Sequence, residues 1–352
     1  MIVTVSTVKD HLSNVQRFVE GNLDGGVDHM VVFLDARAPK VRRWLDSRPE
    51  VTAVVADRPW WGGQRPALLN RRQNINANMA RVVLADLGWA QWLFHVDADE
   101  VLRLDRDQLA RVPAGEPAVG VPPLEVVSVA EPDGPPTLFK RLLDDDQLHL
   151  LTALGLLAEP TNSRYFRSHV AGKVGVRPGA EVWLGIHKAT DATGRRLTLA
   201  LPPGQEMLHY EAFSREDFVR KWVAMVGSGP NVNFGAHRMG LAKALRALVD
   251  MELDDETRAR YLARFYDLHM ADPADDLEAL GLLEHRPPMS HGHQPQVLDE
   301  ARRRELRTAL EAWRTQDKTR LVPPKDPTKG DAARGATGSL TEKVRSRLQR
   351  KG

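Results

Sequence analysis

The chain has 352 residues, of which 42% are hydrophobic and 27% charged, a composition typical of a globular protein with one large domain or two small ones. Its formal net charge is only +2, so we expect no general electrostatic attraction to nucleic acid. It contains no cysteine, which excludes disulfides, zinc–thiolate sites and a cysteine nucleophile.

No apolar stretch is long enough to predict a membrane span. Residues 1–6 form a short apolar segment, without the basic start and long hydrophobic stretch of a secretion signal. From these two features we expect a cytoplasmic protein.

Predicted strands and helices alternate through the first hundred residues. The strands are expected over 2–6, 27–34 and 51–55, with a fourth ending at Asp97. Between them we expect a helix that starts at Lys9 and Asp10, a short helix around 41–45 and a long helix over 66–87. This alternation predicts an α/β fold with an open, mostly parallel sheet flanked by helices.

Polar side chains stand where these strands end, and parallel strands bring their carboxyl ends to one edge of the sheet. The residues concerned are Lys9, Asp10, Asp35, Asp97 and Asp99. Their position predicts a ligand-binding crevice at this edge.

The most informative stretch is the apolar strand that runs into Asp97, Ala98, Asp99 and Glu100. Asp97 and Asp99 are two residues apart, so both point to one face of an extended chain. Carboxylates of this kind hold hard cations together with phosphate oxygens, which predicts a site for Mn²⁺ or Mg²⁺. An acidic turn after a strand is the structural alternative.

The second half of the chain has a looser pattern. Strands are expected within 119–129, 164–176 and 182–189, another closes at His209 and Tyr210, and the run Asp144 to Asp146 is expected to be a solvated turn. Ser214 and Asp217 resemble a capping box, and helices are expected over 239–249, 256–269 and 297–313.

These patterns divide the chain into 1–213, an α/β domain; 214–320, a helical region; and 321–352, a basic tail. After Val322 the tail has 8 Lys and Arg against 3 Asp and Glu, and its Pro and Gly content predicts disorder. It is either a solvated tail or a peripheral contact with an anionic membrane surface or an acidic partner.

Several motifs together resemble the glycosyltransferase family 2-like proteins of GT-A fold. They are a strand followed by Lys9 and Asp10, Gly-Val-Asp-His leading into a strand that ends at Asp35, a helix rich in Gln and Asn, Trp92 with Asp97-Ala98-Asp99-Glu100, Lys173, His187, and His209-Tyr210 before a Ser-Arg-Glu-Asp-Phe helix. The resemblance covers Met1 to Trp222 and implies that 1–213 is a nucleotide-sugar-binding and catalytic domain. For Glu100, a role in the next turn and a role at the sugar remain open. Lys9-Asp10 departs from the family's more usual Lys-Asn-Glu, which affects the expected donor contact and not the fold.

The resemblance implies a metal-dependent glycosyltransferase that uses a nucleotide-sugar donor, with a UDP-sugar as the expected class, and a glycan or small-molecule acceptor. It implies metal ligands at Asp97, Asp99 and His209, although a buried structural histidine is the alternative for His209. It also implies a set of donor-binding residues: Lys9, Asp10, Asp35, Gln73, Asn74, Asp97, Lys173 and His187. Caps, turns and solvated helix faces are the alternatives for Asp35, Lys9, Gln73 and Asn74.

The catalytic base of an inverting reaction stays unassigned, because spacing does not choose among Glu125, Glu131, Asp133 and Glu211. Two other functions also stay open. A nucleotidyltransferase would use the same acidic strand end but would want a glycine-rich loop after the first strand, where Ser6-Thr7-Val8 has no glycine. A non-catalytic module that binds nucleotide-sugars or glycans is the third hypothesis.

Overall fold

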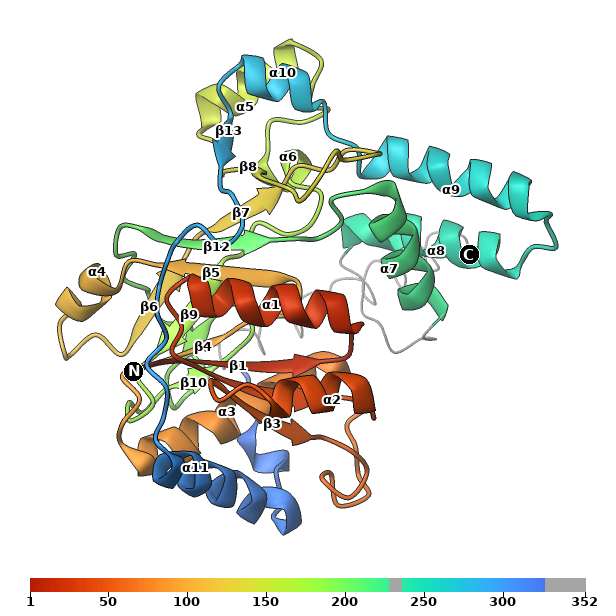
Figure 1. The fold of residues 1–352 in the computed structure, drawn as a ribbon. Helices are drawn as coiled ribbons and strands as arrows, with labels where there is room; N and C mark the ends of the chain where they lie inside the picture. The colour runs from red at the N-terminus through yellow and green to blue at the C-terminus, as the bar shows by residue number, and fades with distance from the viewer. Residues whose placement is uncertain (228–235, 327–352) are drawn as a thin grey trace, which may run out of the picture.

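A six-stranded sheet lies at the centre of the computed structural model, which describes residues 1–227 and 236–326 (Figure 1). Its strand order is β3-β2-β1-β4-β9-β6, and β1 to β4 are parallel while β9 runs antiparallel to both of its neighbours. The bounds are β1 Ile2–Val8, β2 His29–Leu34, β3 Val51–Val55, β4 Trp92–His95, β6 Ala118–Val121 and β9 Lys173–Val176. The predicted α/β class with an open, mostly parallel sheet is confirmed.

Helices cover both faces of this sheet (Figure 1). On one face lie α1 (Leu12–Asp24) and α2 (Pro39–Asp46), and on the other lie α3 (Leu69–Leu87) and α11 (Glu300–Ala312). Successive strand residues point to opposite faces, so Val32 packs in the cluster that holds Phe18 of α1, and Val31 packs in the cluster that holds Met79 of α3. Burial of both faces explains why these strands read as continuous apolar runs.

A second, five-stranded sheet has the order β13-β8-β7-β12-β5. Its strands are β5 Glu100–Leu104, β7 Pro123–Val126, β8 Leu138–Lys140, β12 Gln205–His209 and β13 Leu283–His285. The side chain of Asn22 on α1 joins this sheet, donating to the Glu100 carbonyl at 2.9 Å and accepting from the Leu102 N–H at 3.0 Å. A small ribbon of β10 (Trp183–Leu184) and β11 (Ala189–Thr190) packs near α3.

Three helices of the C-terminal region form a cluster of their own beside the two sheets (Figure 1). They are α7 (Arg215–Gly227), α8 (Ala236–Asp250) and α9 (Asp255–His269), with Trp222, Leu245 and Tyr266 buried together. The short elements are α4 Arg106–Arg111, α5 Asp145–Ala153, α6 Asn162–Tyr165, α10 Ala274–Ala279, η1 Trp313–Thr315 and η2 Thr319–Leu321.

The structure departs from the sequence-based expectations in a few places. The acidic run at 144–146 starts a helix instead of making only a turn, because Asp144 caps α5 in a reciprocal box with Gln147. The segment 164–176 begins with the end of α6, and only its last part is the strand β9. The C-terminal region also includes β13, and its helix α11 returns to the main sheet, where Leu306 and Leu310 are fully buried.

The predicted tail over 321–352 falls mostly beyond the part of the chain that the structure describes. At its beginning, Leu321 is 6% exposed and packs in the core around α3 and α11. Residues 327–352 lie outside the described residues. Within the described ranges, no helix is long and apolar enough to cross a membrane.

Candidate functional site

The carboxyl edge of the main sheet carries the acidic stretch that follows β4. β4 ends at His95, Asp97 and Asp99 follow, and Glu100 begins β5 of the second sheet. The stretch therefore stands where the chain leaves one sheet for the other, as Figure 1 shows. Helix α7 connects Asp10 to this stretch, since its Arg220 lies 3.6 Å from Asp10 and its Lys221 contacts Asp99.

Lys173 reaches this edge because β9 runs antiparallel to β4, which puts the first residue of β9 beside the end of β4. Its buried Nζ lies 2.5 Å from Asp97 Oδ2 and 2.8 Å from Glu100 Oε2. Gln73 of α3 donates to the other Asp97 oxygen at 2.5 Å, and the Asp97 N–H donates to Glu100 at 2.8 Å. Asp97 is thus held between the ammonium of Lys173 and the side-chain amide of Gln73.

Burial and the ammonium of Lys173 shift the pKa values of Asp97 and Glu100 in opposite directions. Burial by itself raises the pKa of Asp97, but the charge and hydrogen bond of Lys173, together with His95, lower it by more and hold that pKa well below the usual range. For Glu100, burial dominates and raises the pKa to about 7. Burial lowers the pKa of Lys173, yet the Asp97 and Glu100 carboxylates together raise it to about 12. Lys173 is therefore a permanent positive charge at this edge.

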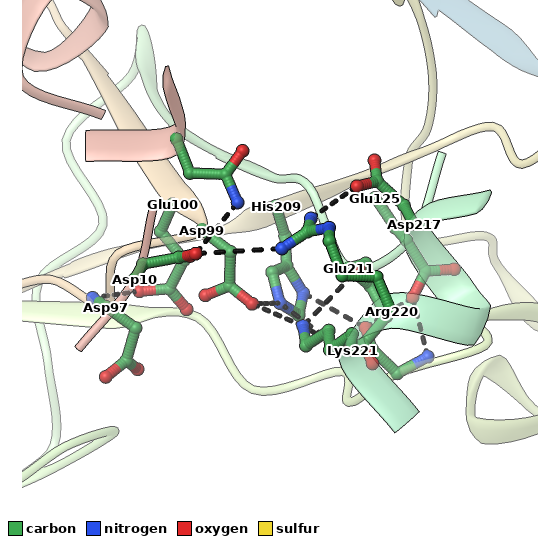
Figure 2. Close-up of polar contacts among 12 residues, drawn as sticks. Asp10, Asp97, Asp99, Glu100, Glu125, His209, Glu211, Asp217, Arg220 and Lys221 are labelled. Atoms are coloured by element: carbon green, nitrogen blue, oxygen red, sulfur yellow. Dashed lines mark hydrogen bonds and ion pairs between the residues drawn. The ribbon is translucent and has the colours of Figure 1, made fainter. Parts of the chain in front are cut away.

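His209 closes β12 and lies directly opposite residues of both neighbouring strands, Glu100 on β5 and Glu125 on β7. Its Nε2 is 3.8 Å from Asp99 Oδ2 and 3.6 Å from Glu211 Oε2. Figure 2 shows the three side chains pointing toward one another. One ligand atom from each of them can be chosen so that all lie within 4.8 Å of one another, a spacing suited to a shared cation.

Lys221 of α7 points into the same group (Figure 2). Its Nζ lies 2.5 Å from Asp99 Oδ2 and 3.1 Å from Glu211 Oε2. Burial raises the pKa of Asp99, but Lys221 and His209 hold it well below the usual range. Burial lowers the pKa of His209, whereas the nearby carboxylates of Asp99, Glu100 and Glu211 together raise it by more, so the net shift is upward.

Two further histidines line the inner side of this site. The ring of His169 stacks on His209 with centroids 4.9 Å apart and meets His187 edge-on at 4.4 Å. Burial lowers the pKa of His169 to about 4 and that of His187 to about 3, so both rings are neutral near pH 7. Glu100, His169 and His209 form a second group with ligand atoms within 4.8 Å of one another.

The other candidates from the sequence lie in varied places. Asp35 is buried and accepts hydrogen bonds from Nε and Nη2 of Arg72, at 2.8 and 2.7 Å, and one from Arg65 at 2.8 Å. Lys9 is exposed, Asn74 is half-buried, and Asp10 accepts from Asn14 at 3.0 Å. Glu131 and Asp133, two of the four candidate bases, sit near the surface, and Glu131 pairs with Arg215 at 3.5 Å.

Sequence reasoning did not single out several residues that the structure brings to the site. Glu211 was considered as a base and not as a ligand, although its position two residues after His209 would place both on one face of an extended chain. Ser168, His169 and Lys221 carried no signal, because only the docking of their segments against the strand ends brings them there.

Comparison with known proteins adds only distant structural matches. No family model matches the sequence, and no curated protein does. The matching solved structures include HddC from Yersinia pseudotuberculosis, at 12% identity and a TM-score of 0.31, covering 62% of this chain and 96% of that one. They also include a 4-diphosphocytidyl-2C-methyl-D-erythritol synthase, at 14% identity and a TM-score of 0.22, covering 88% of this chain and 98% of that one. Similarity this low does not assign a reaction, so any functional inference must come from the site itself.

Proposed function

We propose that the protein is a metal-dependent glycosyltransferase that moves a sugar from a nucleotide-sugar donor to a hydroxyl acceptor. The observation that carries this proposal is the meeting of Asp99, His209 and Glu211 at the edge of the sheet where β4 ends. Ligands of open α/β sheets bind outside the carboxyl ends of the strands, so a cation at this point would meet a bound nucleotide.

The residues present fit a divalent cation. Two carboxylates and one imidazole nitrogen are a ligand set suited to Mn²⁺, which accepts nitrogen more readily than Mg²⁺ does. The ammonium of Lys221 lies between Asp99 and Glu211, so a cation bound to these two carboxylates would take over its charge. Asp97, in contrast, is already held by Lys173 and Gln73, which favours a role facing the donor.

The chemistry of the proposed reaction explains why such a site is useful. A sugar leaves its nucleoside diphosphate as negative charge grows on the phosphate oxygens, and a divalent cation bound there stabilises that charge as a Lewis acid. The chain's own residues would prepare the site. Lys173 fixes the orientation of Asp97 and adds a buried positive charge, and Asp99 stays ionised because its pKa is depressed.

The site combines two of the regions proposed from sequence. The region 1–213 supplies His209 at the end of β12 and Asp99 and Glu211 in the segments that follow β4 and β12, and α7 of the region 214–320 supplies Lys221. We therefore propose that the helical region belongs to the catalytic unit and is not a separate module.

The experiment that tests this function has two stages. Thermal shifts are first measured with UDP-, GDP-, CMP- and dTDP-sugars, each with and without Mn²⁺, to find the donor. Hydrolysis of that donor is then followed, with release of the free nucleotide and sugar expected only when Mn²⁺ is present. Asp146→Asn, which changes an exposed acid of α5, serves as a control that should behave like wild type.

The same assay separates the alternatives. Formation of a nucleoside triphosphate and a sugar phosphate when pyrophosphate is added would identify a nucleotidyltransferase instead. A metal-dependent thermal shift with no turnover of any donor, in the presence or absence of candidate acceptors, would identify a binding module. No shift with any nucleotide-sugar would remove the basis for a nucleotide-sugar function.

A further inference from the structure

A chain of buried hydrogen bonds lies behind His209, on the side of its ring that faces away from Asp99. His209 Nδ1 is 3.0 Å from the hydroxyl of Ser168, and that hydroxyl donates to Oε1 of Glu125. The three residues are between 1% and 3% exposed. The parallel pairing of β12 and β7 makes this possible, because it sets His209 directly beside Glu125.

The direction of the chain follows from counting hydrogens. Glu125 receives the backbone N–H groups of Arg167 and Ser168, each at 2.7 Å, and lies 2.7 Å from the buried ammonium of Lys140. Burial raises the pKa of Glu125, but Lys140 and these donors lower it by more, so the carboxylate is ionised and can only accept. A serine hydroxyl has one hydrogen, and here it goes to Glu125. At His209 the Ser168 oxygen must therefore accept, and Nδ1 must carry the hydrogen.

We propose that Ser168 and Glu125 are positioning residues that fix His209 in the tautomer with its hydrogen on Nδ1, which leaves the Nε2 lone pair for a divalent cation between Asp99 and Glu211. Nε2 faces these two carboxylates at 3.8 and 3.6 Å, so the geometry of the ring agrees with this assignment. The identity of the ligand as a cation rests on the proposed function, whereas the tautomer does not.

The energetic expectation comes from metal sites in general. A ligating histidine usually gives its other ring hydrogen to a carboxylate or another acceptor, and loss of that partner weakens metal binding by roughly 10- to 100-fold. In this protein the acceptor is the hydroxyl oxygen of Ser168, whose own hydrogen goes to Glu125. The position of the hydrogen on His209 therefore depends on both residues.

The first test reads the tautomer directly in the metal-free protein. The protein is labelled with ¹⁵N-histidine, and the His209 signals are assigned with a His209→Gln variant. Long-range ¹⁵N–¹H spectra are recorded at a pH above the titration of His209. In wild type we expect a protonated Nδ1 and an unprotonated Nε2. In Ser168→Ala the preference should weaken or reverse, while Ser168→Thr, which keeps the hydroxyl, should retain it.

The second test measures the affinity for Mn²⁺ alone, from the free-ion signal in electron paramagnetic resonance. Ser168→Ala should bind at least about 10-fold more weakly than wild type, and Ser168→Thr should recover most of the loss. Ser128→Ala is the matched control. Ser128 is equally buried and its hydroxyl meets Tyr266 at 3.0 Å, so its removal also deletes a buried hydrogen bond but leaves His209 alone.

The outcomes separate this inference from the proposed function. A wild-type His209 with its hydrogen on Nε2 would overturn the inference, as would a Ser168→Ala protein that binds Mn²⁺ as tightly as Ser128→Ala. If wild type shows the Nδ1 hydrogen but does not bind Mn²⁺, the hydrogen-bond chain is supported and the proposed cation site is wrong.

Discussion

The side-chain nitrogen of Lys221 lies 2.5 Å from Oδ2 of Asp99, at the place where the proposed site would hold its cation. The same nitrogen is 3.1 Å from Glu211, so one ammonium pairs with both carboxylates of the ligand group (Figure 2). A metal ligand oxygen stands about 2.0–2.6 Å from its ion, so the ammonium and a divalent ion cannot share this space. Binding of the ion must therefore move Lys221 away.

We accordingly expect Lys221→Met to bind Mn²⁺ several-fold more tightly than wild type. Methionine is of similar length but carries no charge, so the competitor is removed while much of the packing is kept. Without metal the variant should melt at a lower temperature, because Asp99 and Glu211 lose their counter-charge. Calorimetric titration and thermal melts measure both effects, with Lys40→Met, an exposed lysine of α2, as the control. Unchanged or weaker Mn²⁺ binding by Lys221→Met would refute the competition.

Asp99→Asn should abolish metal-dependent turnover while leaving the fold intact. Asparagine is nearly isosteric and still offers an oxygen, but it lacks the negative charge that holds a hard cation beside a pyrophosphate. We expect a loss on the order of a thousandfold in donor turnover, which corresponds to several kcal/mol of barrier. Turnover is measured over a Mn²⁺ titration beside the Asp146→Asn control. Full activity with an unchanged Mn²⁺ dependence would show that Asp99 only stabilises the turn after β4 and does not bind the metal.

The sequence predicted the main sheet well because its signals are local. Val31 and Val32 sit in a continuous apolar run, and such a run already indicates a strand buried on both faces. Asp97 and Asp99 could be located for the same reason, since an apolar strand that stops at several acids is visible in the chain itself.

The rest of the site depends on long-range pairing that no local pattern encodes. Lys173 contacts Asp97 only because β9 enters the sheet antiparallel, 76 residues later in the chain. Lys221 contacts Asp99 only because α7 returns to the acidic stretch, 122 residues later in the chain. The pairing of Asp35 with Arg72 likewise joins the end of β2 to the start of α3. The sequence alone therefore could not decide whether Asp35 caps a turn or contacts a nucleotide.

That pair leads to a prediction about stability. The side chains of Asp35 and Arg72 are 3% and 8% exposed. Removal of Arg72 leaves the buried Asp35 carboxylate with only the more exposed Arg65 as a charged partner, so much of its charge stays uncompensated. We expect Arg72→Met to lower the free energy of unfolding by about 3 kcal/mol in urea titrations. The adjacent Arg71, which is exposed, gives the matched control Arg71→Met, with a change within about 0.5 kcal/mol. A stability for Arg72→Met equal to that of its control would show that this pair contributes little to the fold.

Histidine burial in the main sheet gives the last prediction, which concerns pH. His29 of β2 is fully buried and its Nε2 lies 2.9 Å from the hydroxyl of Thr52. Burial, with a smaller contribution from Arg303, lowers the pKa of His29 from 6.5 to about 3. The folded protein therefore keeps this ring neutral over a range where the unfolded chain binds a proton. Its contribution to stability is complete above pH 6.5 and is lost as the pH falls from 6.5 toward 3.

We expect His29→Gln to make the protein less sensitive to acid. Each pH unit in this window is worth up to about 1.4 kcal/mol for one proton, so between about pH 7.5 and pH 5 wild type should lose about 2 kcal/mol more than the variant. Urea unfolding at the two pH values measures this difference, which cancels the constant cost of the substitution and the contributions of other buried histidines. His149→Gln, at an exposed position on α5, should lose as much stability as wild type. Equal losses in wild type and His29→Gln would mean that His29 titrates normally in the folded protein.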